Sequence, residues 1–172
     1  MPTLIHADAL DSAPCFLVYL WRARHGDASA TTKNGVIMTI TVETTVHAPI
    51  AQVWKIYTSP EHIVHWNAAS DDWHTTKATV DLRPGGNFCS RMEAKDGSFG
   101  FDFAGTYTSV KPNSLIEYSF GDRKARVEFS ENQAGVSVRV SFDAEQTHSI
   151  DQQREGWQAI LNRFKQYAES KK

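Results

Sequence analysis

The sequence contains few cysteines and no motif that pairs them. Only Cys15 and Cys89 occur among its 172 residues, and they are too few and too far apart for a disulfide framework. Free thiols are typical of proteins in a reducing compartment. We therefore expect both cysteines to be free thiols and the protein to be cytoplasmic.

An excess of one charge and a long apolar run are also missing. The chain has 18 lysines and arginines against 20 aspartates and glutamates, interspersed along it, so no basic stripe is available to nucleic acid or anionic lipid. The apolar run 15–21 is far shorter than a membrane span and follows Asp8 and Asp11 instead of a basic region. We predict no nucleic-acid binding, no membrane insertion and no signal peptide.

Motifs of common catalytic and cofactor sites are absent as well. There is no Gly-x-Ser-x-Gly, no phosphate loop and no dinucleotide fingerprint. His62 and His65 lie three residues apart, and His74 follows Asp71 and Asp72, but this spacing matches no standard run of metal ligands. The sequence therefore predicts no cofactor, no metal and a solvated polar edge at these histidines.

What the chain does have is a sharp change of pattern near Met38. Residues 1–37 carry no sustained period, and the stretch 27–35 is small, polar and linker-like. From Met38 onward the pattern is regular, and the overall hydrophobic content of 41% is enough for a core. We predict an irregular or disordered N-terminal extension over 1–37 and one domain over 38–172.

The regular part begins and ends with helical signals around a series of strands. Residues 39–45 alternate as a half-buried strand, proline at the first turn marks a helix after Ala48, and Ser59-Pro60-Glu61 starts a second short helix. Ser149 caps a long helix that continues to about Ala168. The segments predicted as strands between these helices are 73–81, 87–94, 99–110, 115–120, 124–130 and 136–143. Because short turns join them, these strands must be antiparallel neighbours.

A set of short motifs follows the same order as these elements. They are Ala48-Pro49-Ile50-x-x-Val53-Trp54, Ser59-Pro60-Glu61-His62-Ile63, the stretch Trp66 to Trp73, Arg83-Pro84-Gly85-Gly86, Phe103-Ala104-Gly105-Thr106-Tyr107 and Gly156-Trp157. Together they resemble the START-like superfamily, also called SRPBCC or Bet v 1-like helix-grip. The branch they are most similar to contains the C-terminal domain of activators of the heat-shock protein 90 ATPase.

This resemblance implies an α+β helix-grip fold. Its curved antiparallel sheet of about seven strands wraps on the long C-terminal helix, with two short helices after the first strand. It also implies a cavity between sheet and helix, such as relatives use for lipids, sterols, polyketides and flavonoid-like compounds. The Trp66 to Trp73 stretch would then mark the cavity entrance, where the short helices meet the sheet.

Nine aromatic residues are our candidates for binding a ligand in that cavity. They are Trp66, Trp73, Phe88, Phe101, Phe103, Tyr107, Tyr118, Trp157 and Phe164. Aromatic side chains suit flat or aliphatic ligands through buried area and stacking. The same positions also fit an ordinary filled core, because any packed sheet shows this alternation.

Charged strand residues occupy the alternate positions. Arg91, Glu93, Asp102, Glu117, Arg126, Glu128 and Arg139 are expected to form cross-strand ion pairs on the solvated convex face. If a bulge reversed the register, Asp102 or Glu117 could instead face the cavity and act as a general base. Cys89 is not expected to be a nucleophile, because Arg91 is the only cation near it in sequence.

Three functions therefore stay open. The first is a protein that binds a hydrophobic small molecule such as a lipid, polyketide or flavonoid-like compound. The second is a cyclase- or hydrolase-like enzyme that uses a pocket carboxylate or tyrosine. The third is a chaperone-interaction module of the ATPase-activator kind, and relatives of this type also allow a homodimer.

Overall fold

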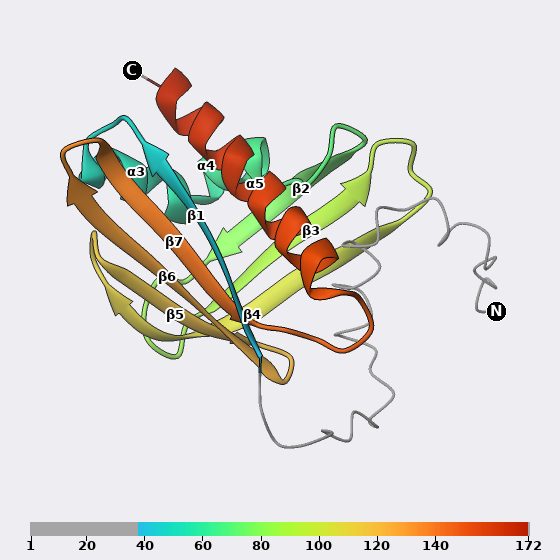
Figure 1. Cartoon of the computed structure of the whole chain (residues 1–172). Helices are drawn as coiled ribbons and strands as arrows, with labels where there is room; N and C mark the ends of the chain where they lie inside the picture. Colours follow the sequence, from blue (N-terminus) through green and yellow to red (C-terminus); the bar gives the residue numbers. More distant parts are fainter. Residues whose placement is uncertain (1–37, 172) are drawn as a thin grey trace.

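The computed structural model describes residues 38–171, and the extension predicted over 1–37 lies outside these described residues. The domain is an α+β fold in which a long helix crosses the concave side of one curled sheet (Figure 1). Its strands and helices are β1 Thr39–Val46, α3 Ile50–Thr58, α4 Pro60–Trp66, β2 Trp73–Val80, β3 Asn87–Ala94, β4 Gly100–Lys111, β5 Leu115–Phe120, β6 Arg123–Asn132, β7 Gly135–Asp143 and α5 Ile150–Ser170.

All seven strands form one antiparallel sheet in the order β1-β7-β6-β5-β4-β3-β2. Strands β2 to β7 pair with their neighbours in sequence because the turns between them are short. Strand β1 instead pairs with β7, from Thr39 opposite Asp143 to Val46 opposite Val136. The helix-grip prediction is confirmed, and no strand begins or ends more than two residues from its predicted bounds.

The two faces of the sheet separate apolar from charged side chains. On the concave face lie buried side chains such as Met92, Phe101, Ile116 and Val140. The alternate positions carry the expected convex-face ion pairs: Arg91 with Glu93 and Asp102, Arg126 with Glu117 and Glu128, and Arg139 with Glu43. Since these side chains are about one-third exposed or more, they contribute little to stability and mainly keep this face in water.

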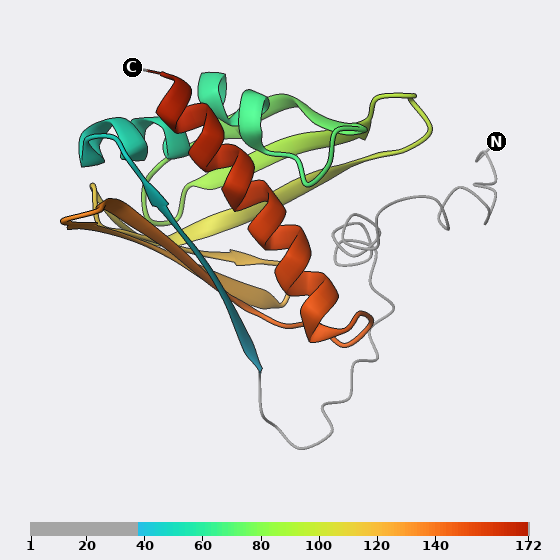
Figure 2. The ribbon, with the colours of Figure 1, turned by 45° about the horizontal axis from the view of Figure 1, so that its top comes forward.

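Helix α5 turns its apolar stripe toward the sheet, and the short helices lie beside its C-terminal half (Figure 2). The stripe consists of Trp157, Leu161, Phe164 and Ala168, all buried at spacings of three or four residues. Ser149 caps the helix: its hydroxyl accepts a hydrogen bond from Gln152 N–H at 3.2 Å, and the Gln152 side chain accepts one from Ser149 N–H at 3.1 Å. Ser59, by contrast, precedes α4 without a side-chain capping bond.

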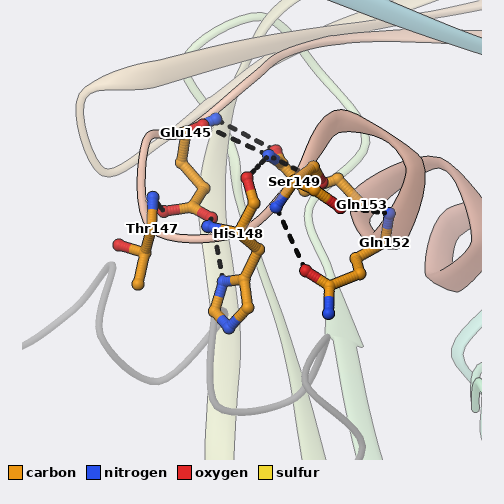
Figure 3. Close-up of polar contacts among 6 residues, drawn as sticks. All are labelled: Glu145, Thr147, His148, Ser149, Gln152 and Gln153. Atoms are coloured by element: carbon orange, nitrogen blue, oxygen red, sulfur yellow. Dashed lines mark hydrogen bonds and ion pairs between the residues drawn. The ribbon is translucent and has the colours of Figure 1, made fainter.

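A buried polar cluster fixes the connection from β7 to α5 (Figure 3). Gln153 is 1% exposed, and its side-chain amide donates to the carbonyls of Glu145 at 3.2 Å and His148 at 3.0 Å while accepting from Glu145 N–H at 3.0 Å. The Glu145 carboxylate accepts hydrogen bonds from the backbone N–H groups of Thr147 and His148. Burial acts to raise the pKa of Glu145, but these hydrogen bonds outweigh it, so the pKa is lowered. The connection therefore sets where α5 begins and how the helix is placed against the sheet.

Replacing Gln153 by leucine should lower the free energy of unfolding by about 2–3 kcal/mol. The leucine fills the same space but leaves the carbonyls of Glu145 and His148 without their donor. Urea denaturation of Gln153→Leu and of Gln166→Leu, an exposed position on the same helix, measures the difference. Equal stabilities for the two variants would contradict this structural role.

Within residues 38–171, no helix is both long and apolar enough to cross a membrane.

Candidate ligand cavity

A cavity lies between the concave face of the sheet, helix α5 and the two short helices. Its volume is about 100 Å³, and about 840 Å³ when all the space between the lining atoms is counted, including the part open to solvent. Side chains from α3, α4, β3, β4, β5, β7 and α5 line it. The space between sheet and helix is thus not completely filled.

Six of the nine aromatic candidates lie together on this cavity. They are Trp66, Phe88, Phe103, Tyr107, Tyr118 and Trp157. The Phe88 ring packs at the centre of the strand residues, with its centroid 5.2 Å from that of Tyr107 and 5.0 Å from that of Tyr118. Trp157 stacks on Phe142 at 4.1 Å between ring centroids. Aromatic rings therefore form a large part of the wall, and they are held in place by contacts with other rings.

The other three candidates are buried away from the cavity. Trp73 packs with Phe99 and Phe101, with ring centroids 6.1 Å away in both cases, as a separate cluster. Phe164 lies behind the wall, 5.1 Å from the rings of both Tyr57 and Trp66. Of the two tryptophans that bracket the predicted entrance, only Trp66 lines the cavity.

Ten lining residues were not among the sequence candidates. They are Tyr57, Thr58, Ile63, Asn67, Ser90, Met92, Ile116, Val140, Ile160 and Leu161. Ser90 and Met92 alternate with Phe88 on β3, and Ile116 alternates with Tyr118 on β5, so the two-residue period could have identified them. Tyr57 is on the apolar stripe of its helix, but only the packing of α3 against the sheet brings it to the cavity.

The loop after α4 is held at the cavity by several contacts. Asn67 lines the cavity, and its carbonyl accepts a hydrogen bond from the Thr75 hydroxyl at 2.6 Å. Asp71 forms an ion pair with Arg163 on α5. Trp66 donates its indole N–H to the Ile56 carbonyl at 3.2 Å, which joins α4 to α3. The Trp66 to Trp73 stretch therefore attaches the short helices to both α5 and the sheet.

Three tyrosines bring hydroxyl groups to the cavity wall: Tyr57, Tyr107 and Tyr118. The Arg83-Pro84-Gly85-Gly86 turn positions one of them, because Gly85 N–H donates to the Tyr107 carbonyl and Tyr107 N–H donates to the Gly86 carbonyl, both at 2.8 Å. Burial raises the pKa of all three hydroxyls, and the nearby Tyr107 raises those of Tyr57 and Tyr118 further. All three are therefore neutral phenols at ordinary pH.

Among residues 38–171, no charged side chain lines the cavity. Asp102 and Glu117, the carboxylates considered as general bases, lie on the convex face, where Asp102 is 3.5 Å from Arg91 and Glu117 is 2.6 Å from Arg126. The bulge in β4 falls after Tyr107 and does not bring Asp102 inside. Neither of the two carboxylates considered as a general base therefore faces the cavity.

The histidines that invited a metal hypothesis contact a tyrosine. His62 Nδ1 is 3.1 Å from the Tyr167 hydroxyl, and the His65 ring stacks on Tyr167 with centroids 5.4 Å apart. In the part of the chain that the structure describes, no three histidine, cysteine, aspartate or glutamate side chains are grouped so that they could hold a metal ion. These histidines instead pack against the C-terminal end of α5.

A curled seven-stranded sheet that grips a long helix over an apolar cavity defines the START-like, or SRPBCC, class of proteins. Within it, residues 47–169 match the family model described as "Activator of Hsp90 ATPase homolog 1-like protein". The chain belongs to this family. No curated protein matches the chain.

Solved structures agree with this assignment. An AHSA1-like protein from Aeromonas hydrophila is 45% identical with a TM-score of 0.74, over 77% of this chain and 93% of that one. A protein from Cytophaga hutchinsonii is 50% identical with a TM-score of 0.68, over 77% and 92%. A protein from Nitrosomonas europaea, at 18% identity and a TM-score of 0.65 over 77% and 95%, shares the fold alone.

Proposed function

We propose that this protein binds a small hydrophobic molecule in the cavity between the sheet and α5, in the cytoplasm. The observation that carries the proposal is a cavity rich in aromatic rings, on which the described residues place no charged side chain. Such a wall favours ligands that bury apolar area and stack on rings. Binding is favoured over turnover because, of the described residues on the wall, only tyrosines could act as an acid or base.

The volume limits what can be bound. At about 100 Å³ the cavity is smaller than an engineered cavity of about 150 Å³ that takes benzene. The enclosed space therefore takes a short aliphatic segment or part of one ring, and the rest of a polyketide, flavonoid-like or lipid molecule would lie at the open mouth. We therefore infer that the bound part is compact, whatever the total size of the ligand.

A thermal-shift screen against lipids, flavonoids and polyketide-like aromatics tests the proposal. At a concentration of 100 Kd, a ligand stabilises the folded state by about 2.7 kcal/mol, which is a shift of several degrees in Tm. Ser90→Leu, which adds apolar volume at the cavity, should lose this shift, whereas Ser130→Leu at an exposed strand position should keep it. A screen without any stabilising compound, or a shift equal in both variants, would count against the cavity as the binding site.

A second candidate is an interaction module that stimulates a chaperone ATPase, which the family match over 47–169 favours. The test is the ATPase rate of the heat-shock protein 90 homologue from the same cell, measured with and without this protein. Stimulation that is unchanged in Ser90→Leu would assign the function to the surface of the domain and not to its cavity.

A further inference from the structure

Three different elements each place one tyrosine on the same cavity. Tyr57 comes from α3, Tyr107 from β4 and Tyr118 from β5. Tyr107 and Tyr118 face each other across neighbouring strands, with ring centroids 6.5 Å apart. In addition to burial, Tyr107 raises the pKa of Tyr57, and both of these residues raise the pKa of Tyr118, so the three hydroxyls lie in one electrostatic environment. The other polar lining side chains, Thr58, Asn67 and Ser90, are also neutral.

None of these three hydroxyls is occupied by a hydrogen bond to another described residue. Tyr107 and Tyr118 are each 7% exposed, yet neither they nor Tyr57 makes a side-chain hydrogen bond within residues 38–171. Tyr167, outside the cavity, has its hydroxyl 3.1 Å from His62 Nδ1. The three hydroxyl oxygens are not among the fully buried, unpartnered polar atoms of the described residues, so they have accessible surface at the cavity that they line. They are therefore free to donate a hydrogen bond to an oxygen acceptor on a bound molecule.

We propose that Tyr57, Tyr107 and Tyr118 make the cavity selective for uncharged ligands that carry a carbonyl oxygen on a compact apolar body, such as an aromatic ketone. A hydrocarbon of the same shape would leave the hydroxyls unpaired. A carboxylate would lose its hydration without meeting a positive side chain, because the described part of the chain places none on the cavity. This inference rests on the proposed function and specifies the ligand class of the same cavity.

Three probes of nearly the same shape separate these chemistries: acetophenone, isopropylbenzene and benzoate. Each has one phenyl ring. Acetophenone adds a carbonyl group, isopropylbenzene an isopropyl group and benzoate a carboxylate. One net hydrogen bond of about 0.5–1.5 kcal/mol should make acetophenone bind about three- to tenfold more tightly than isopropylbenzene. Benzoate should not bind measurably. Calorimetric or NMR titration of the full chain gives the three dissociation constants.

Phenylalanine variants test which hydroxyls are responsible. Tyr107→Phe and Tyr118→Phe should weaken acetophenone to about the affinity of isopropylbenzene, whose own binding confirms that each variant is folded. Tyr167→Phe, which removes a hydroxyl outside the cavity, should change neither affinity. If the hydroxyls donate hydrogen bonds, only the affinity for acetophenone should fall. A general loosening of the wall would weaken isopropylbenzene as well.

The outcomes separate this inference from the proposed function. If isopropylbenzene binds as tightly as acetophenone and the phenylalanine variants have no effect, the tyrosines do not select the ligand, while the cavity remains a binding site. If benzoate binds more tightly than acetophenone, the tyrosines bind an anion and the inference is wrong. If none of the probes binds, selectivity for a compact ketone is wrong, and the wider thermal-shift screen decides the proposed function separately.

Discussion

Replacing Phe164 by alanine should lower the free energy of unfolding by about 3–5 kcal/mol. Phe164 is fully buried on α5, and its ring meets those of Tyr57 and Trp66 edge-on at 5.1 Å. Removing it deletes ring contacts that join the long helix to both short helices. The resulting void would also lie directly behind two residues of the cavity wall.

Urea denaturation of Phe164→Ala and Phe164→Leu separates the loss of the ring's volume from the effect of any substitution at this position of the helix. The leucine retains most of the volume and should lose less than about 1.5 kcal/mol. A loss below about 1 kcal/mol in the alanine variant would mean that α5 and the short helices do not pack through Phe164. We also expect Phe164→Ala to accept larger ring compounds in the thermal-shift screen than the unchanged protein does.

The second large effect is expected for Gly105→Ala, which should cost about 3 kcal/mol or more. A Cβ atom built at Gly105 would lie 2.3 Å from the Ser119 carbonyl oxygen on β5 and 2.7 Å from the Phe88 ring. Phe88 can turn aside, but the backbone carbonyl belongs to the sheet and moves only with its strand. Such overpacking forces backbone shifts, at the upper end of the usual cost range.

Gly97→Ala provides the comparison. This glycine has a φ of +75° in the turn before β4, but nothing lies within 4 Å of its added Cβ, so the change should cost only about 1–2 kcal/mol of backbone strain. Chemical denaturation ranks the two variants. A smaller loss for Gly105→Ala than for Gly97→Ala would contradict the close approach of β5 and Phe88 to Gly105.

The order of elements and the two faces of the sheet could be predicted because they depend on local chemistry. Pro60 begins α4, and Ser149 with Gln152 caps α5, as their residue types favour. The two-residue period placed Asp102 and Glu117 on one face and Phe103 and Tyr118 on the other, which the ion pairs and the cavity wall confirm. No bulge in this part of the sheet reverses that pattern.

Position along a strand was not predictable in the same way. Phe101 and Phe103 share a face, yet Phe103 lines the cavity and Phe101 packs with Trp73. The two-residue period identifies the face of the sheet on which a side chain lies. Whether that side chain reaches the cavity depends on the curvature of the sheet and on where α5 crosses the sheet. Tyr57 is a second example, since the apolar stripe of a helix does not show which of its residues lines a cavity.

The sequence by itself determined the fold, the family and the aromatic character of one sheet face, because periodicity, caps and turn residues act over a few neighbouring positions. The tertiary structure alone decided that a cavity remains, which six aromatic candidates line it and that three tyrosine hydroxyls meet there. These features depend on how far the helix stands from the sheet, a distance set by side chains more than 100 positions apart, such as Tyr57 and Phe164.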